Sequence, residues 1–210
     1  MTLRLLSAAT VVAAVAVSAE AQDDWLTWSS QQAERTAKST IARGRVAGGR
    51  RLLNTERARS YKLTATWFTP DVVRATARTI QIKQRLSDEE AVALVATAER
   101  PNTTVIMIEL DPDEGSGVIP LNWEAFLQPR NAADRAVRGT KAPQMRDIIA
   151  LAGVSPRNYD YDRFWMTFPL SRDSGEPLFN TTDREAELSV RIYDREGSVR
   201  WPTPAAMVDR

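Results

Sequence analysis

The side chains that could do chemistry in this sequence are mainly carboxylates, because its 210 residues include no histidine and no cysteine. Without histidine there can be no Ser-His-Asp triad, no Cys-His pair and no histidine-ligated zinc or iron. Without cysteine there can be no thiolate nucleophile, iron–sulfur cluster or disulfide. Two reaction types stay open, namely glycoside hydrolysis by paired carboxylates and acyl transfer by a Ser-Lys dyad.

Two groups of acidic residues could supply a carboxylate pair. The first is the loop 111–117, and the second is Asp160 with Asp162, which flank a tyrosine before a predicted strand. Short acidic side chains also stabilise turns, which explains both groups without chemistry. The loop does not match an EF-hand, because Ser116 and Asn122 stand where that motif needs Gly and Glu. We therefore predict no catalytic, cofactor-binding or metal-binding residues, with calcium bound in another geometry at 111–117 as the open alternative.

Three further patterns also have structural explanations. Ser87 follows Lys83 by four residues and could act with it as a Ser-Lys dyad, but Ser87 and Glu90 form a capping box at a helix start. Gly44 and Gly49 have the spacing of a phosphate-binding loop, but arginines follow where that loop needs Lys and then Ser or Thr. Tryptophans can stack on sugars, but four of the six lie in strand patterns, where core packing is expected. These four are Trp67, Trp123, Trp165 and Trp201.

Residues 1–21 have the features of an export signal. One arginine precedes an uncharged run from Leu5 to Val17, and Ala19-Glu20-Ala21 gives the small-x-small pattern that a signal peptidase cleaves. The run is shorter than the roughly 20 apolar residues that a membrane span needs. We predict cleavage after Ala21, no transmembrane segment in the mature chain, and a soluble protein in the periplasm or outside the cell.

Residues 22–59 are predicted to be a basic, partly helical or disordered segment ahead of a globular domain at 60–204. The segment is arginine-rich, contains several glycines and has no continuous apolar stripe, which favours a flexible tether. Over the whole chain, 28 basic residues balance 27 acidic ones and leave a net charge of +1. This balance argues against a nucleic-acid-binding protein.

The pattern from residue 60 onward predicts an α+β fold. Alternating and β-rich runs indicate strands, and Thr69-Pro70 and Ser87 start two consecutive helices. The expected strands are 61–68, 103–110, 118–121, 123–128, 163–168, 187–193 and 198–201, with a short helix at 145–151 and a hairpin turn at 194–197. We expect a mostly antiparallel small β-sandwich or curled sheet with an inserted helical hairpin.

Several short motifs occur in a characteristic order. They are Ala65-Thr66-Trp67-Phe68-Thr69-Pro70, Trp123-Glu124-Ala125-Phe126-Leu127, Tyr161 with Phe168-Pro169, and Trp201. This order resembles a set of uncharacterised bacterial exported proteins, many of them lipoproteins, over about residues 60–201. The chain lacks the cysteine that would carry a lipid. The resemblance implies export and a single domain, and it implies no activity and no binding residues.

Two function classes remain. The first is an exported, soluble, non-enzymatic domain that binds or positions an unknown envelope or secreted protein through a strand edge or an aromatic surface. The alternative is a carboxylate-dependent glycan hydrolase that uses residues such as Asp111, Asp113, Asp160 and Asp162. The two classes differ in one structural feature, because a hydrolase needs two carboxylates about 5 to 10 Å apart in a concave site.

Overall fold

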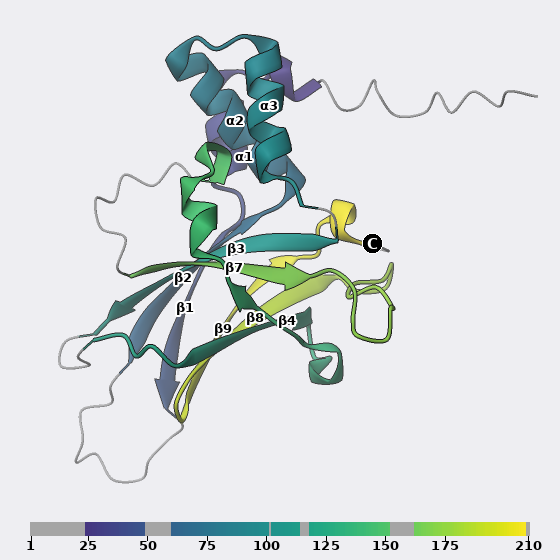
Figure 1. Ribbon diagram of the computed structural model, residues 1–210. Coiled ribbons are helices and arrows are strands. Elements are labelled where there is room, and N and C mark those ends of the chain that lie inside the picture. The colour runs from purple at the N-terminus through teal and green to yellow at the C-terminus, as the bar shows by residue number, and fades with distance from the viewer. Residues whose placement is uncertain (1–23, 49–59, 101, 114–117, 152–161, 209–210) are drawn as a thin grey trace, which may run out of the picture.

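The structure is a computed structural model that describes residues 24–48, 60–100, 102–113, 118–151 and 162–208. These residues form an antiparallel, nearly closed, barrel-like sheet with three α-helices gathered at one end (Figure 1). The predicted α+β class and the mostly antiparallel sheet are confirmed. No helix within the described ranges is long and apolar enough to cross a membrane. The predicted export signal lies outside these ranges.

Nine strands make up the sheet, in the spatial order β5-β4-β8-β9-β1-β2-β3-β7-β6. Their bounds are β1 (Ile41–Gly48), β2 (Tyr61–Phe68), β3 (Thr103–Pro112), β4 (Trp123–Pro129), β5 (Val137–Arg138), β6 (Thr140–Lys141), β7 (Arg163–Pro169), β8 (Glu185–Ile192) and β9 (Arg195–Pro202). The α-helices are α1 (Ser30–Ala37), α2 (Pro70–Gln84) and α3 (Asp88–Ala98). Short 3-10 helices are η1 (Asp24–Thr27), η2 (Ala133–Arg135), η3 (Pro143–Asp147), η4 (Ile149–Leu151) and η5 (Ala205–Met207).

One short segment brings the two ends of this strand order together. Strands β5 and β6 are separated only by Gly139, so the chain pairs first with β4 and then with β7. A side chain at Gly139 would place its Cβ 2.6 Å from the ring of Phe168. The glycine therefore lets residues 137–142 lie directly on the core as they cross from β4 to β7. We call these residues the seam segment.

Two hydrophobic clusters follow from the alternation of side chains along the strands. Trp67, Ile106 and Trp201 belong to the cluster between the walls of the sheet. Phe68 and Val105 point to the other face and pack with the helices α2 and α3 and with η4. Because β2 and β3 are buried on both faces in this way, β3 reads as a continuous apolar run rather than an alternating one.

The helical hairpin forms as its capping residues predict. Thr69 accepts a hydrogen bond from the Val72 N–H at the start of α2, which has Pro70 at its first position. At the start of α3, Ser87 accepts from the Glu90 N–H at 3.2 Å, and the Glu90 carboxylate accepts from the Ser87 N–H at 2.7 Å. Each cap satisfies amide groups that a helix leaves unpaired at its N-terminus.

The segment 22–59 was predicted to be partly helical or disordered; it contains the helix α1, but the prediction of a flexible tether is wrong for its described part. Strand β1 lies in the sheet between β2 and β9, and Ala33 of α1 is completely buried. In β1, Arg43 and Arg45 are exposed, whereas Val46 is buried on the opposite face. The arginines are thus the solvated face of a strand, and the folded unit begins well before the predicted boundary.

Two glycines at the junction of β1 and β9 explain why this strand was missed. An added Cβ at Gly44 would lie 2.6 Å from the Ser198 carbonyl oxygen, and one at Gly197 would lie 2.2 Å from the Arg45 carbonyl oxygen. Glycine is needed here because the two backbones approach closely. The prediction read Gly44 as a linker residue and Gly197 as a turn residue.

Three smaller predictions also need correction. The hairpin turn is at Tyr193-Asp194, because Ile192 pairs with Arg195, and Gly197 lies within β9. Residues 118–121 form no strand, and two 3-10 helices, η3 and η4, replace the single helix expected near 145–151.

Candidate binding site

The acidic residues singled out from the sequence have structural partners. Asp111, near the end of β3, lies 3.5 Å from the Lys62 ammonium of β2. Asp113 accepts a hydrogen bond from Arg45 at 2.8 Å and another from the Ser60 hydroxyl. These contacts join the ends of β1, β2 and β3, so both carboxylates are explained by strand pairing.

The second acidic group does not complete a catalytic pair with the first. The main-chain oxygen of Asp162 accepts a hydrogen bond from the Leu110 N–H at 2.9 Å, so Asp162 lies opposite Leu110 in the β3–β7 register. Neighbouring side chains in a strand point to opposite faces, which separates Asp162 from Asp111. Asp160 and residues 114–117 lie outside the described ranges. Within those ranges, no three acidic residues gather as a metal site would require.

The remaining sequence candidates also have structural positions. Ser87 caps α3, and Lys83 is an exposed residue in the last turn of α2. All four tryptophans that were predicted to lie in the core are buried, with at most 5% of their surface exposed. One of them, Trp123, also lines a cavity, and this cavity is the best candidate for a functional site among the described residues.

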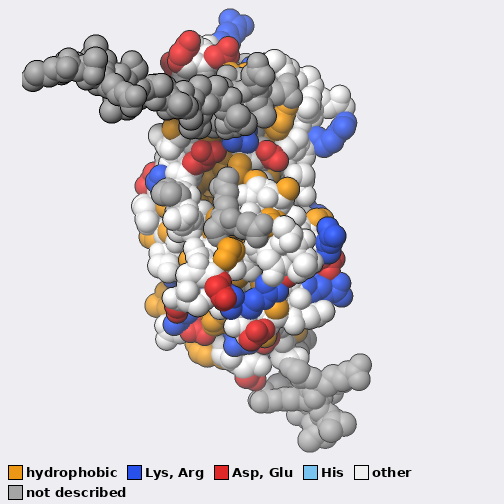
Figure 2. Space-filling model, turned by 90° about the vertical axis from the view of Figure 1, so that its right-hand side faces the viewer, with side chains coloured by type: hydrophobic (Ala, Val, Ile, Leu, Met, Phe, Trp, Pro, Cys, Tyr) orange, Lys and Arg blue, Asp and Glu red, His pale blue; other side chains and the backbone are white. Residues whose placement is uncertain are grey.

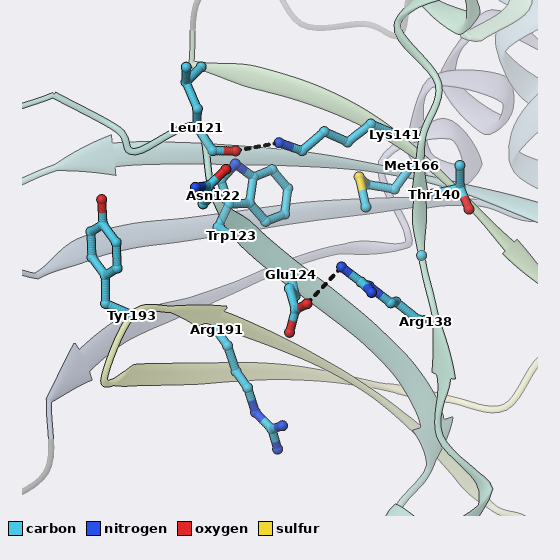
Figure 3. A pocket seen from close by; sticks show the side chains of 11 residues that line it. Leu121, Asn122, Trp123, Glu124, Arg138, Thr140, Lys141, Met166, Arg191 and Tyr193 are labelled. Atoms are coloured by element: carbon cyan, nitrogen blue, oxygen red, sulfur yellow. Dashed lines mark hydrogen bonds and ion pairs between the residues drawn. The ribbon is translucent and has the colours of Figure 1, made fainter.

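The cavity opens beside the seam segment, where β4 and β6 diverge, and has a volume of about 770 Å³ (Figure 3). This volume falls within the range of small-molecule sites. Its lining residues are Leu121, Asn122, Trp123, Glu124, Arg138, Gly139, Thr140, Lys141, Met166, Arg191 and Tyr193. We call this cavity the seam pocket.

Cationic side chains outnumber carboxylates in the lining of the seam pocket. Three of these side chains are cationic and one, Glu124, is a carboxylate. The Lys141 ammonium donates to the main-chain oxygen of Leu121 at 2.7 Å and lies 5.1 Å from the centre of the Trp123 ring. An ammonium has three N–H groups, so two are left to meet a ligand. Stacking over an aromatic face holds the charge in place.

The two arginines of the pocket are positioned by neighbouring strands. Arg138 makes an ion pair with Glu124 across β4 and β5 at 2.7 Å. Arg191 pairs with Glu196 at 3.2 Å and lies over the ring of Phe126. Each pair uses part of a five-donor guanidinium, so further donors remain on both side chains.

Trp123 adds a polar group that has no partner among the described residues. Its indole nitrogen is buried and makes no hydrogen bond, while its ring packs edge-on against Phe164 at 5.0 Å. Leaving such a group unpaired costs about 1 to 3 kcal/mol.

A smaller cavity of about 150 Å³ adjoins the seam pocket through Lys141. It adds two more cationic lining residues, Arg146 and Arg163, and an aromatic wall from Phe164 and Trp165. Elsewhere on the surface, basic and acidic side chains are interspersed, as the face in Figure 2 shows.

Sequence reasoning missed the seam pocket. It assigned no strand or helix to 129–142, because β5 and β6 are only two residues each. Arg138 and Lys141 come from this segment, and Arg191 comes from β8. The available signal was the alternation of Val137, Gly139 and Lys141 with Arg138 and Thr140.

Comparison with known proteins adds no assignment, since no family model, curated protein or solved structure matches this chain. The resemblance to uncharacterised exported proteins stays a prediction.

Proposed function

We propose that this protein is an exported, non-enzymatic binding module and that the seam pocket binds an anionic group of an envelope or secreted component. Cleavage after Ala21 would place the mature chain in the periplasm or outside the cell. The resemblance of residues 60–201 to exported proteins supports the same location.

A single observation carries the proposal: three cationic side chains against one carboxylate line a concave pocket in a protein whose net charge is only +1. Low-dielectric walls strengthen the attraction between each of these cations and an anion. Lys141, Arg138 and Arg191 all keep N–H donors that their protein partners do not use. Charge-assisted hydrogen bonds from these groups are stronger than hydrogen bonds between neutral groups.

The glycan hydrolase alternative has less support. Among the described lining residues, Glu124 is the only carboxylate, and it is held in an ion pair by Arg138. A glycosidase of the usual kind needs a second carboxylate within about 10 Å and on the other side of the scissile bond. No observation in the described ranges favours this reaction over binding.

The proposal can be tested with two probes that both carry carboxylates, one on a sugar chain and one on a peptide chain. An oligogalacturonate and an oligoglutamate supply carboxylates from sugar and from peptide, and maltohexaose is the neutral control. We expect at least one anionic probe to bind, with its affinity reduced about tenfold or more in Lys141→Glu. Lys83→Glu makes the same charge change on exposed α2 and should bind like the wild type.

Calorimetric titration measures these affinities directly. Failure of both anionic probes to bind would overturn the proposal. Equal weakening by Lys141→Glu and Lys83→Glu would also overturn it, because the effect would then come from net charge and not from the seam pocket.

A further inference from the structure

The seam pocket lies where the seam segment stops pairing with β4 and begins to pair with β7. Arg138 is opposite Phe126 in the β4–β5 register. The Gly139 N–H still donates to the Ala125 carbonyl oxygen at 2.8 Å. Beyond this bond the seam segment leaves β4 and pairs with β7, where Lys141 lies opposite Met166.

If the β4–β5 register continued past Gly139, Lys141 would lie opposite Trp123. In an extended strand, the N–H and C=O groups of alternate residues point to the same side. Because Ala125 points its carbonyl at the seam segment, the main chain of Trp123, two residues earlier, faces the same way. No main-chain hydrogen bond joins Trp123 to Lys141 within the described part of the chain.

The main chain of Lys141 faces Trp123 for the same reason. The Ala142 N–H donates to the Trp165 carbonyl oxygen at 2.8 Å, so Ala142 and Thr140 face β7. Lys141 therefore turns its N–H and C=O away from β7 and toward β4. Two short strand edges thus border the seam pocket from opposite sides, each with a main-chain donor and acceptor, and Figure 3 shows the strands diverging around it.

We propose that the anionic ligand of the seam pocket is an acidic peptide segment bound in an extended conformation. This inference rests on the binding function proposed above and names its ligand class. The peptide main chain hydrogen-bonds to the open edges at Trp123 and Lys141. One of its carboxylates is bound by the Lys141 ammonium, which lies over the Trp123 ring.

Two observations favour a peptide over other anions. Trp123 and Lys141 each present one main-chain N–H and one C=O group to the pocket, and an extended peptide backbone offers an acceptor and a donor at the matching spacing. The rim also carries large exposed apolar side chains, Leu121 at 86% and Tyr193 at 72% exposure, and both line the pocket. An extended acidic peptide with apolar residues between its carboxylates can contact Lys141 with one face and this rim with the other.

The test uses a pentapeptide of alternating glutamate and valine, acetylated and amidated at its ends and labelled for fluorescence anisotropy. A second peptide carries N-methyl groups on its central amides, which removes main-chain donors and keeps the carboxylates. A third has glutamine for each glutamate, which keeps the backbone and removes the charge. An oligogalacturonate of equal charge is the non-peptide anion.

We expect the first peptide to bind and the two modified peptides to bind at least about tenfold more weakly. Lys141→Glu should weaken the first peptide similarly, and Lys83→Glu should not. Equal binding of the N-methylated peptide, or binding of the oligogalacturonate alone, would overturn the peptide inference and leave an anion-binding pocket. Failure of every anionic probe would overturn both proposals.

Discussion

Replacement of Gly197 by alanine tests the shortest approach that an added Cβ would make at any described glycine. The new Cβ would lie 2.2 Å from the carbonyl oxygen and 2.6 Å from the carbonyl carbon of Arg45. Both atoms are main chain, so no side chain can move aside, and β9 must shift away from β1. The short pairing of these strands at Ala47 and Gly48 would be strained or lost.

The expected loss follows from these contacts. Overpacking of this kind costs about 1 to 3 kcal/mol, and each lost ladder hydrogen bond adds about 1 kcal/mol. Removing glycine from the unfolded chain returns about 0.4 to 1 kcal/mol. We therefore expect Gly197→Ala to lower the free energy of unfolding by about 2 to 4 kcal/mol.

Gly48→Ala is the matched control on the same pair of strands. Its Cβ would meet nothing closer than the Arg195 Cγ at 3.7 Å, an ordinary contact. We expect Gly48→Ala to be as stable as the wild type or more stable by up to about 1 kcal/mol. Urea unfolding followed by circular dichroism gives both values from the transition midpoints. Equal stability of Gly197→Ala and Gly48→Ala would refute the close packing of β1 on β9.

Three further predictions concern other parts of the chain. Hydrogen bonds from Arg135 at 2.6 and 2.9 Å lower the pKa of Asp183, and a bond from the Asn180 N–H lowers it further. Asp183→Asn should lower the free energy of unfolding by about 2 to 3 kcal/mol at neutral pH. The pKa of Asp183 is lower in the folded state than in the unfolded state, where it is near 3.9. The difference in unfolding free energy between the wild type and Asp183→Asn should therefore be largest at higher pH and should disappear as acid protonates the Asp183 carboxylate. A difference that does not depend on pH in urea unfolding would contradict this. A chain lacking residues 1–48 loses β1 and should show no cooperative unfolding, whereas a sharp transition would mean that β1 is dispensable. The intact mass of exported protein should correspond to a chain starting at Gln22, and recovery of only the 210-residue chain would contradict cleavage after Ala21.

The helical hairpin and the longer strands could be predicted from local signals. Thr69 and Ser87 determine where α2 and α3 begin through hydrogen bonds to amides three residues away. Strand β8 has a core-facing residue at every second position, so its alternation is visible in the sequence. In these elements the residues that determine the structure are close together in the chain.

Strand β1 and the seam pocket could not be predicted in the same way. The strand character of β1 depends on Gly44 lying against Ser198, more than 150 residues later in the chain. The pocket combines Trp123, Lys141 and Arg191, which come together through two strand pairings that differ in length. Contacts of this kind between distant segments leave no period in a single sequence.

The most direct test of the binding account is to locate the ligand by nuclear magnetic resonance. The isotope-labelled protein is titrated with the glutamate–valine pentapeptide, and shifts are followed at the Trp123 indole N–H, the Trp123 and Lys141 amides, and the Lys83 amide. We predict the largest changes at Trp123 and Lys141, with Lys83 on α2 unchanged. Largest changes on the helices, or none at Trp123 and Lys141 at a peptide concentration that saturates binding, would contradict the assignment of the seam pocket as the binding site.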